Sequence, residues 1–235
     1  MLFRSVKLAA LYGIYPHLLG FCGPLEKSET KIILDFLSGF NVPEKKIRKI
    51  LKEFKGAYFY YKLIAKSNKI KNPFDEKVVR AYWIGNSLLE KVKIKDLKKM
   101  IANDFKAEKE IPETSKPHHS FHVLAIGSVS KRVNLKGEKL DLCRISWGKV
   151  IRKSKVKSQK SKVTVKYQPL IKNKKFKFGK AIQKEIFWDK IFTPKIKIGD
   201  WVSLHWNHLI QILNREDLKN LKKYTKLTLN SLNEK

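Results

Sequence analysis

Cysteine is scarce in this chain, and its two cysteines, Cys22 and Cys143, lie far apart in the sequence. This usage excludes a small disulfide-stapled scaffold and is typical of a reducing compartment, so we expect a cytoplasmic protein. No uninterrupted apolar run reaches the roughly 18 residues of a membrane span, which argues against a transmembrane helix. We interpret residues 1–12 as a first helix, because this stretch lacks the small-residue cleavage site of a signal peptide.

Acidic side chains are outnumbered by basic ones, with 21 Asp and Glu against 52 Lys and Arg, and the formal net charge is +31. A field of this sign attracts polyanions, so nucleic acid, the ribosome and anionic membranes are candidate partners. The alternative is compositional, because lysine far outnumbers arginine, as in a lysine-biased proteome. Hydrophobic residues make up 43% of the 235 residues, which is enough for a globular core.

Sequence motifs of common enzyme classes are also missing. No glycine-rich phosphate loop, dinucleotide-binding fingerprint or nucleophile elbow occurs. Carboxylates are rare near the histidines and cysteines, where Asp75, Asp141 and Asp200 are the candidate orienting acids. These absences leave histidine and cysteine as the residues best suited to carry chemistry.

The hydrophobic pattern changes its period near the middle of the chain. Apolar residues recur at helical spacing in the first half and alternate with polar residues in the second. We therefore predict an α+β protein, with an N-terminal helical bundle over residues 1–110 and an antiparallel β domain over 117–235. The β domain is expected to form a sheet or a small barrel. Asn214 is a suitable N-cap for a C-terminal helix that closes the chain.

Two segments at the start of the second half predict an antiparallel pair of strands. Residues 121–127 form an apolar run typical of a buried strand, and residues 140–150 alternate between two faces. We therefore expect residues 121–133 to pair with residues 140–151.

A basic β-hairpin is predicted within residues 142–184, where acidic side chains are missing. Alternating lysines on its strands are suited to follow a phosphate backbone. Lysine on an edge strand also prevents aggregation, so both interpretations stay open. The candidate nucleic-acid-binding residues are Lys153, Lys155, Lys157, Lys162 and Lys166.

All six histidines and both cysteines fall in a few lysine-poor islands. Imidazole and thiolate are common ligands of zinc, nickel, iron and copper, so a transition-metal ion is the candidate cofactor. No spacing matches a zinc finger, and hydrogen-bonded core histidines remain the alternative. The candidate metal ligands are His118, His119, His122, His205 and Cys22. We predict that at least two side chains among these four histidines and Cys143 lie within about 8 Å of each other.

Cys143 and Arg144 form a candidate catalytic pair. A neighbouring cation and a nearby imidazole would lower the pKa of the thiol and make it nucleophilic. An enzyme that uses Cys143 with a histidine base is therefore an alternative to metal binding. His17, Asn86 and Trp147 are further candidate site residues, because each lies in an island or interrupts an apolar face.

The islands together resemble an uncharacterised prokaryotic family, a domain of unknown function. The resemblance extends over residues 5–210. Members of that family are often encoded beside nickel-iron hydrogenase genes. The resemblance therefore implies an accessory or maturation role, with a hydrogenase subunit or maturation factor as partner, and it implies no catalytic residue. We expect a cytoplasmic accessory protein with a His/Cys-lined pocket. The motifs that carry the resemblance lie at 15–24, 81–86, 118–123, 143–148 and 205–206.

Overall fold

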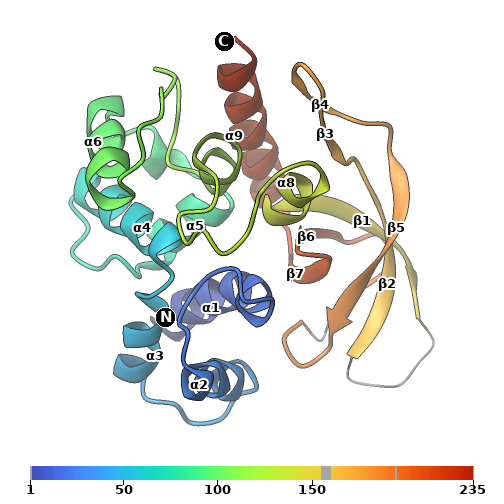
Figure 1. Ribbon diagram of the computed structural model, residues 1–235. Helices are drawn as coiled ribbons and strands as arrows, with labels where there is room; N and C mark the ends of the chain where they lie inside the picture. The colour runs from blue at the N-terminus through green and yellow to red at the C-terminus, as the bar shows by residue number, and fades with distance from the viewer. Residues whose placement is uncertain (1, 155–159, 194, 235) are drawn as a thin grey trace.

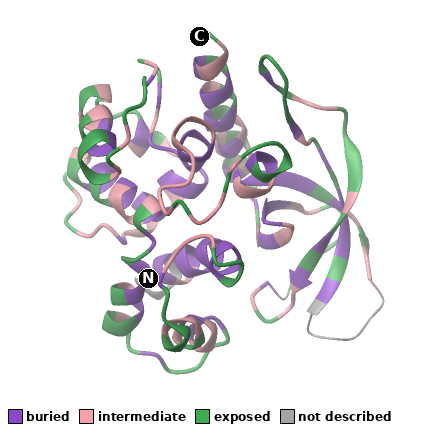
Figure 2. Cartoon of the chain, in the orientation of Figure 1, coloured by how far each residue is buried: buried purple, intermediate pink, exposed green. Residues whose placement is uncertain are grey.

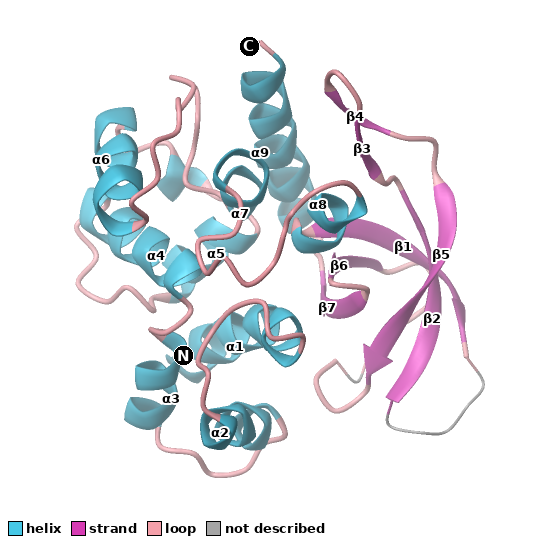
Figure 3. Cartoon of the chain, viewed as in Figure 1, coloured by secondary structure: helices cyan, strands magenta, loops and turns pink. Residues whose placement is uncertain are grey.

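The computed structural model describes residues 2–154, 160–193 and 195–234. The helices that come first in the chain lie on one side, and the strands lie on the other, with α8 and α9 between them (Figures 1 and 3). The early helices are α1 (Leu2–Leu18), α2 (Lys27–Leu37), α3 (Glu44–Leu51), α4 (Lys55–Ser67), α5 (Glu76–Trp83), η1 (Ser87–Leu89) and α6 (Ile94–Asp104). The later ones are α7 (His119–Phe121), the π-helix η2 (His122–Ile126), α8 (Glu138–Cys143) and α9 (Arg215–Asn233).

Within the described residues, strands close into a small barrel in the order β1-β2-β5-β7-β6. All its pairings are antiparallel except β5 with β7, which are parallel where Phe187 pairs with His208. The predicted α+β class and small barrel are thus confirmed, with mixed rather than purely antiparallel pairing. The strands are β1 (Ser146–Lys153), β2 (Lys160–Tyr167), β5 (Ile182–Asp189), β6 (Trp201–His205) and β7 (His208–Ile212), with β3 (Leu170–Lys172) and β4 (Phe176–Phe178) as a separate pair.

Helix α1 lies at the centre of the core. It carries no charged side chain from Leu8 to Leu18, and most of its residues are buried (Figure 2). A helix that is apolar all round is stable only inside a protein. The hydrophobic cluster around it includes Ile145, Trp206 and Tyr224, so the core joins the early helices to the barrel side. The division into units at 1–110 and 117–235 stays a prediction.

The predicted strand at 121–127 is wrong, because residues 119–126 are helical. The Nδ1 atom of His118 accepts the backbone N–H of Ser120 and thereby caps α7. Gly127, with a φ of 88°, ends the helical segment. A short apolar run fits a buried helix as well as a buried strand, and here the capping imidazole favours the helix.

The predicted pairing of 121–133 with 140–151 is also wrong. Residues 138–143 form α8, and β1 begins at Ser146 and pairs with β2 and β6. The carboxylate of Asp141 accepts hydrogen bonds from Nε of Arg144 at 2.9 Å and from the backbone N–H of Leu170 at 2.8 Å. The hydrogen bond to Leu170 ties α8 to β3. The charge of Asp141 is tolerated in the interior because the Arg144 guanidinium compensates it.

Two other predictions are confirmed by the structure. The closing helix α9 begins after Asn214, whose side chain forms a capping box with Asp217. The basic hairpin exists as β1 and β2, which pair from Gly148 to Lys153 and from Val163 to Tyr167. Within the described residues, no helix has the length and apolar character needed to cross a membrane.

Candidate metal centre

Three of the predicted side chains, His119, Cys143 and His205, meet in the interior. One potential ligand atom from each lies within 4.8 Å of the other two, which confirms the predicted convergence for these residues. His119 is 5% exposed and His205 is 2% exposed. Ligands around a tetrahedral ion with bonds of 2.0–2.3 Å lie about 3.5 Å apart, so an upper limit of 4.8 Å on the three separations is compatible with donors around one ion.

His205 reaches this position because the chain turns sharply after β6. Trp206 and Asn207 have φ angles of 50° and 61°, which form a tight two-residue turn into β7. The backbone N–H of Trp206 donates to the carbonyl of Leu142 at 2.8 Å. Leu142 precedes Cys143, so the hairpin tip and the end of α8 are joined beside the cluster.

The orientation of His205 depends on a proline inside α1. Pro16 has no N–H, so it cannot donate the usual helical hydrogen bond to the carbonyl of Tyr12 four residues earlier. Nδ1 of His205 donates to that carbonyl at 2.8 Å. The ring proton therefore lies on Nδ1 and Nε2 keeps its lone pair. Nε2 is buried, faces the backbone of Cys143 and has no hydrogen-bond partner among the described residues.

His119 is held from both sides of its ring. Nδ1 lies 3.0 Å from the hydroxyl of Tyr82, and Nε2 lies 2.9 Å from the carbonyl of Cys143. The Tyr82 hydroxyl donates to the carbonyl of Gly56 at 2.7 Å, so its oxygen is available to accept the Nδ1 proton of His119. The Cys143 carbonyl can only accept, so Nε2 of His119 donates to it. An ion could bind Nε2 only after this proton moves to Nδ1, where the Tyr82 hydroxyl oxygen can accept it.

Burial keeps the histidines of the cluster uncharged at neutral pH. Loss of solvent lowers the pKa of His205 to about 3, although the hydrogen bond to Tyr12 acts in the opposite direction. Burial lowers the pKa of His119 well below its usual value, and a positive charge on His205 would lower it further. Neutral imidazoles are the form that binds metal ions.

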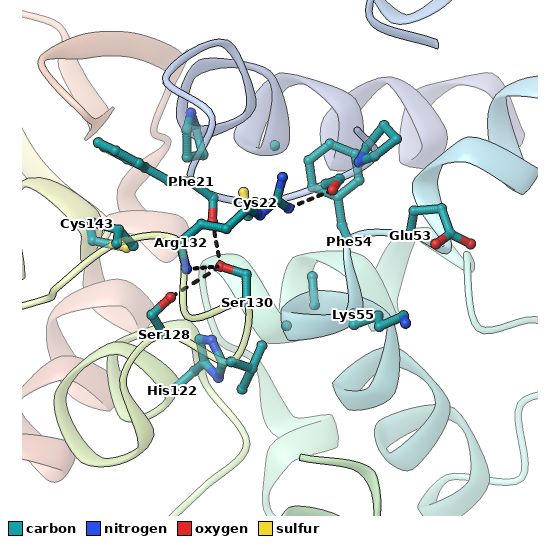
Figure 4. Close-up of a pocket in the computed structure, with 18 of the residues that line it drawn as sticks. Phe21, Cys22, Glu53, Phe54, Lys55, His122, Ser128, Ser130, Arg132 and Cys143 are labelled. Atoms are coloured by element: carbon teal, nitrogen blue, oxygen red, sulfur yellow. Dashed lines mark hydrogen bonds between the residues drawn. The ribbon is translucent and has the colours of Figure 1, made fainter. Parts of the chain in front are cut away.

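A cavity of about 680 Å³ opens onto the cluster, and His119, Cys143 and His205 lie among its lining residues. Cys22 and His122 also line it (Figure 4). The loop that carries Cys22 is fixed by two hydrogen bonds, from Ser130 to the carbonyl of Phe21 at 2.6 Å and from Arg132 to the carbonyl of Gly23 at 2.6 Å. These two loops form part of the cavity wall, and the hydrogen bonds between them fix their relative position.

The other predicted metal ligands lie outside the three-residue group. His118 caps α7 and stacks on Tyr224, with ring centroids 5.8 Å apart. Nδ1 of His122 lies 3.4 Å from the Tyr60 hydroxyl. Cys22 shares the cavity, and burial raises the pKa of its thiol.

The predicted catalytic pair has a different geometry from the one expected. The Arg144 guanidinium binds Asp141 and the carbonyl of Gln168, so it is committed to the buried ion pair. Burial raises the pKa of the Cys143 thiol, the neighbouring Cys22 thiol raises it further, and Trp206 acts in the opposite direction. Burial thus acts against the expected activation of the thiol, and the catalytic pair stays a prediction.

The three remaining candidates hold local structure together. His17 lies 3.1 Å from the carbonyl of Cys22 through Nδ1 and 2.7 Å from the Thr30 hydroxyl through Nε2. Asn86 caps the short helix η1 and donates to the carbonyl of Lys77. Trp147 is buried in contact with Phe178.

Of the candidate nucleic-acid-binding lysines that the structure describes, one is half-buried and two are exposed. Lys153 donates to the carbonyl of Ile196 at 2.9 Å and lies over the ring of Trp188. Lys162 is exposed and lies 3.4 Å from Glu185, and Lys166 is exposed. Lys155 and Lys157 lie outside the described residues.

Sequence reasoning missed the residues that orient the two histidines. Tyr12 contributes a backbone carbonyl, Tyr82 contributes a hydroxyl, and Pro16 frees the carbonyl of Tyr12. A proline late in an apolar helix was the available signal, because it always leaves one carbonyl without its helical donor.

We predict that His122 makes the protein sensitive to acid. Burial lowers its pKa to about 4, below the value of about 6.5 in an unfolded chain. The unfolded chain therefore binds more protons between these values, and stability falls as the pH drops through this window. Replacing His122 with glutamine should reduce the loss of unfolding free energy between pH 7 and pH 5 by about 2 kcal/mol. Urea unfolding at both pH values measures this, and equal losses in both proteins would contradict it.

Comparison with known proteins gives one match. The chain matches a family described as a family of unknown function (DUF6390) over residues 3–235. No curated protein matches it, and no solved structure does. Because the match covers nearly the whole chain, the protein belongs to this family of unknown function, DUF6390.

Proposed function

We propose that the protein binds one transition-metal ion between His119, Cys143 and His205 and acts as a metal-handling accessory protein. The observation that carries this proposal is the buried lone pair of His205 Nε2. This atom has no hydrogen-bond partner among the described residues and faces the cluster. A buried polar atom without a partner is costly, and an ion at this position would satisfy it.

The surroundings of both histidines support the same proposal. Ligating histidines usually donate their second ring N–H to a backbone carbonyl or another polar group, which fixes the ring. His205 donates to the Tyr12 carbonyl, and His119 has the Tyr82 hydroxyl at 3.0 Å. The Nδ1 atom of each candidate histidine ligand therefore has a polar group beside it that could fix the ring.

The donor set limits the kind of ion. Two imidazoles and one thiolate suit zinc, nickel, cobalt and copper, and do not suit magnesium or calcium, which prefer oxygen. Three protein ligands leave a tetrahedral ion one free position, and in this protein it would face the cavity. The ion would also favour the thiolate of Cys143, whose pKa is otherwise raised by burial.

The proposed partner is a nickel-iron hydrogenase subunit or maturation factor, and the proposed location is the cytoplasm. The hydrogenase partner rests on the motif resemblance alone, and the location on the scarcity of cysteine. Nucleic-acid binding by the β1–β2 hairpin remains the alternative, and it rests on charge. Lys162 lies 3.4 Å from Glu185, and Lys153 is half-buried and donates to the carbonyl of Ile196, so neither ammonium group is fully free to bind a phosphate.

We predict that the metal-free protein binds one Zn²⁺ or Co²⁺ per chain. Co²⁺ should give the near-ultraviolet absorption of a thiolate-to-cobalt bond. Replacing His119 or His205 with alanine, or Cys143 with serine, should weaken binding at least about 100-fold, because each change removes a ligand rather than an outer-shell partner. Titration against a chromophoric chelator measures the affinity.

The matched control is His208→Ala. His208 lies on the same hairpin as His205 but stacks between Tyr15 and Phe187. This variant should bind metal like the wild type. Equal affinity in all variants, or cobalt binding without the thiolate absorption, would contradict the site. Circular dichroism identifies any variant that fails to fold.

A second prediction concerns the proline. Replacing Pro16 with alanine supplies an N–H that competes with His205 for the Tyr12 carbonyl. The change should strengthen helix α1, because proline in a helix interior is unfavourable. It should nevertheless weaken metal binding about 10-fold, since the orientation of His205 is lost. A variant that is more stable and binds metal as tightly as the wild type would contradict this role.

A further inference from the structure

The cavity in front of the candidate metal centre is far larger than an ion needs. Its volume is about 680 Å³. One water occupies about 30 Å³ in the liquid, whereas pockets for small organic molecules span about 300–1,000 Å³. The size therefore fits an organic molecule together with the ion.

The cavity walls are mostly apolar. The ring of Phe54, which lines the cavity, packs closely against two glycines. A Cβ atom at Gly13 would lie 2.8 Å from its ring, and one at Gly23 would lie 2.6 Å from it. Larger residues at these glycines would displace the ring. Other large apolar side chains of the wall include Phe21, Phe59, Phe105, Val133 and Leu135.

The cavity leads from solvent to the cluster. Lys55 and Asp104 are exposed lining residues, whereas His119 and His205 are buried. Figure 4 shows Cys143 on one side of the cavity, with Glu53 and Lys55 on the other. A molecule that enters between the charged residues would thus meet the three donor atoms at the far end.

The charges along the cavity differ from those of the whole protein. Among the described lining residues, four are acidic and three are basic, in a chain with 21 acidic and 52 basic side chains. The cavity therefore lacks the positive excess that would select a phosphate or another polyanion. The acidic residues are Glu26, Glu29, Glu53 and Asp104, and the basic ones are Lys49, Lys55 and Arg132.

We propose that this cavity binds a small, largely apolar molecule, uncharged or cationic, whose nitrogen or sulfur atom ligates the metal at the fourth position. The part of this inference that concerns metal ligation rests on the proposed function. The part that concerns the apolar body of the molecule rests on the size and the walls of the cavity. In this arrangement the metal would hold one end of the organic molecule and the apolar wall would hold the other.

The test uses 4-phenylimidazole and imidazole as probes. Both offer the same nitrogen donor, and the phenyl ring adds an apolar body. On the cobalt-loaded protein, 4-phenylimidazole should bind at least about tenfold more tightly than imidazole, as measured by the change in the visible cobalt spectrum, because its ring is buried against the wall. Equal affinities with cobalt bound would overturn the organic pocket and leave the metal site intact.

Two variants fill the cavity without touching the donor atoms. Leu135→Trp and Val133→Phe each enlarge a half-buried lining side chain. Either variant, once shown to fold, should lose the advantage of 4-phenylimidazole while imidazole binding stays unchanged. Leu18→Trp is the control, because Leu18 is 52% exposed and does not line the cavity. An unchanged advantage in both filled variants would overturn the proposed position of the ring.

The cavity can also be tested if the protein does not bind metal. If the protein takes up no cobalt, the proposed function fails, and the cavity is then tested in the metal-free protein. Trp83 and Trp206 line the cavity, so a bound ring should quench their fluorescence. Saturable quenching by 4-phenylimidazole that disappears in Val133→Phe, which adds no tryptophan, would support the pocket, and an absence of quenching in the wild type would overturn it.

Discussion

The hydrogen bond from Nδ1 of His205 to the carbonyl of Tyr12 is the interaction on which the candidate site depends. It exists because Pro16 leaves that carbonyl without a helical donor inside an otherwise regular helix. A proline in a helix interior destabilises the helix, and here the same proline makes it possible to orient His205, almost 200 residues later in the sequence. Helix α1 is buried and apolar, so water does not compete for the carbonyl, and the imidazole presents its lone pair to the cluster.

Charged side chains in this protein lie mainly at the surface, and the histidines and thiols of the cluster are uncharged. The lysines that give the net charge of +31 lie mostly on the surface, while the interior around the cluster holds neutral histidines and protonated thiols. Burial lowers the pKa of the imidazoles and raises the pKa of the thiols, because both shifts disfavour the charged form. A cation that binds here would release the thiol proton of Cys143 and find both imidazoles uncharged, with the Nε2 lone pair of His205 already available. The cavity, with nearly balanced charges, is a route by which a cation can avoid the positive surface.

The sequence predicts the composition of the site better than its geometry. Histidine and cysteine in lysine-poor islands correctly indicated convergence, and the change of hydrophobic period correctly indicated an α+β fold with a small barrel. The helical state of residues 119–126 was not predictable, because an apolar run of this length fits either state until the cap at His118 is seen. The surroundings of Arg144 were not predictable for a related reason. Its neighbour in sequence is Cys143, but its partner in space is Asp141, and only the folding of α8 brings that carboxylate to it.

The central claim is that one thiolate and two imidazoles hold the same ion. X-ray absorption at the metal edge of the zinc- or cobalt-loaded chain tests it most directly, because sulfur and nitrogen scatter at different distances, about 2.3 Å and about 2.0 Å from zinc. The account predicts one sulfur and two imidazole nitrogens in the first shell, with the sulfur lost in Cys143→Ser and one nitrogen lost in His205→Ala. A first shell of light atoms alone, or a sulfur contribution that persists in Cys143→Ser, would contradict the account.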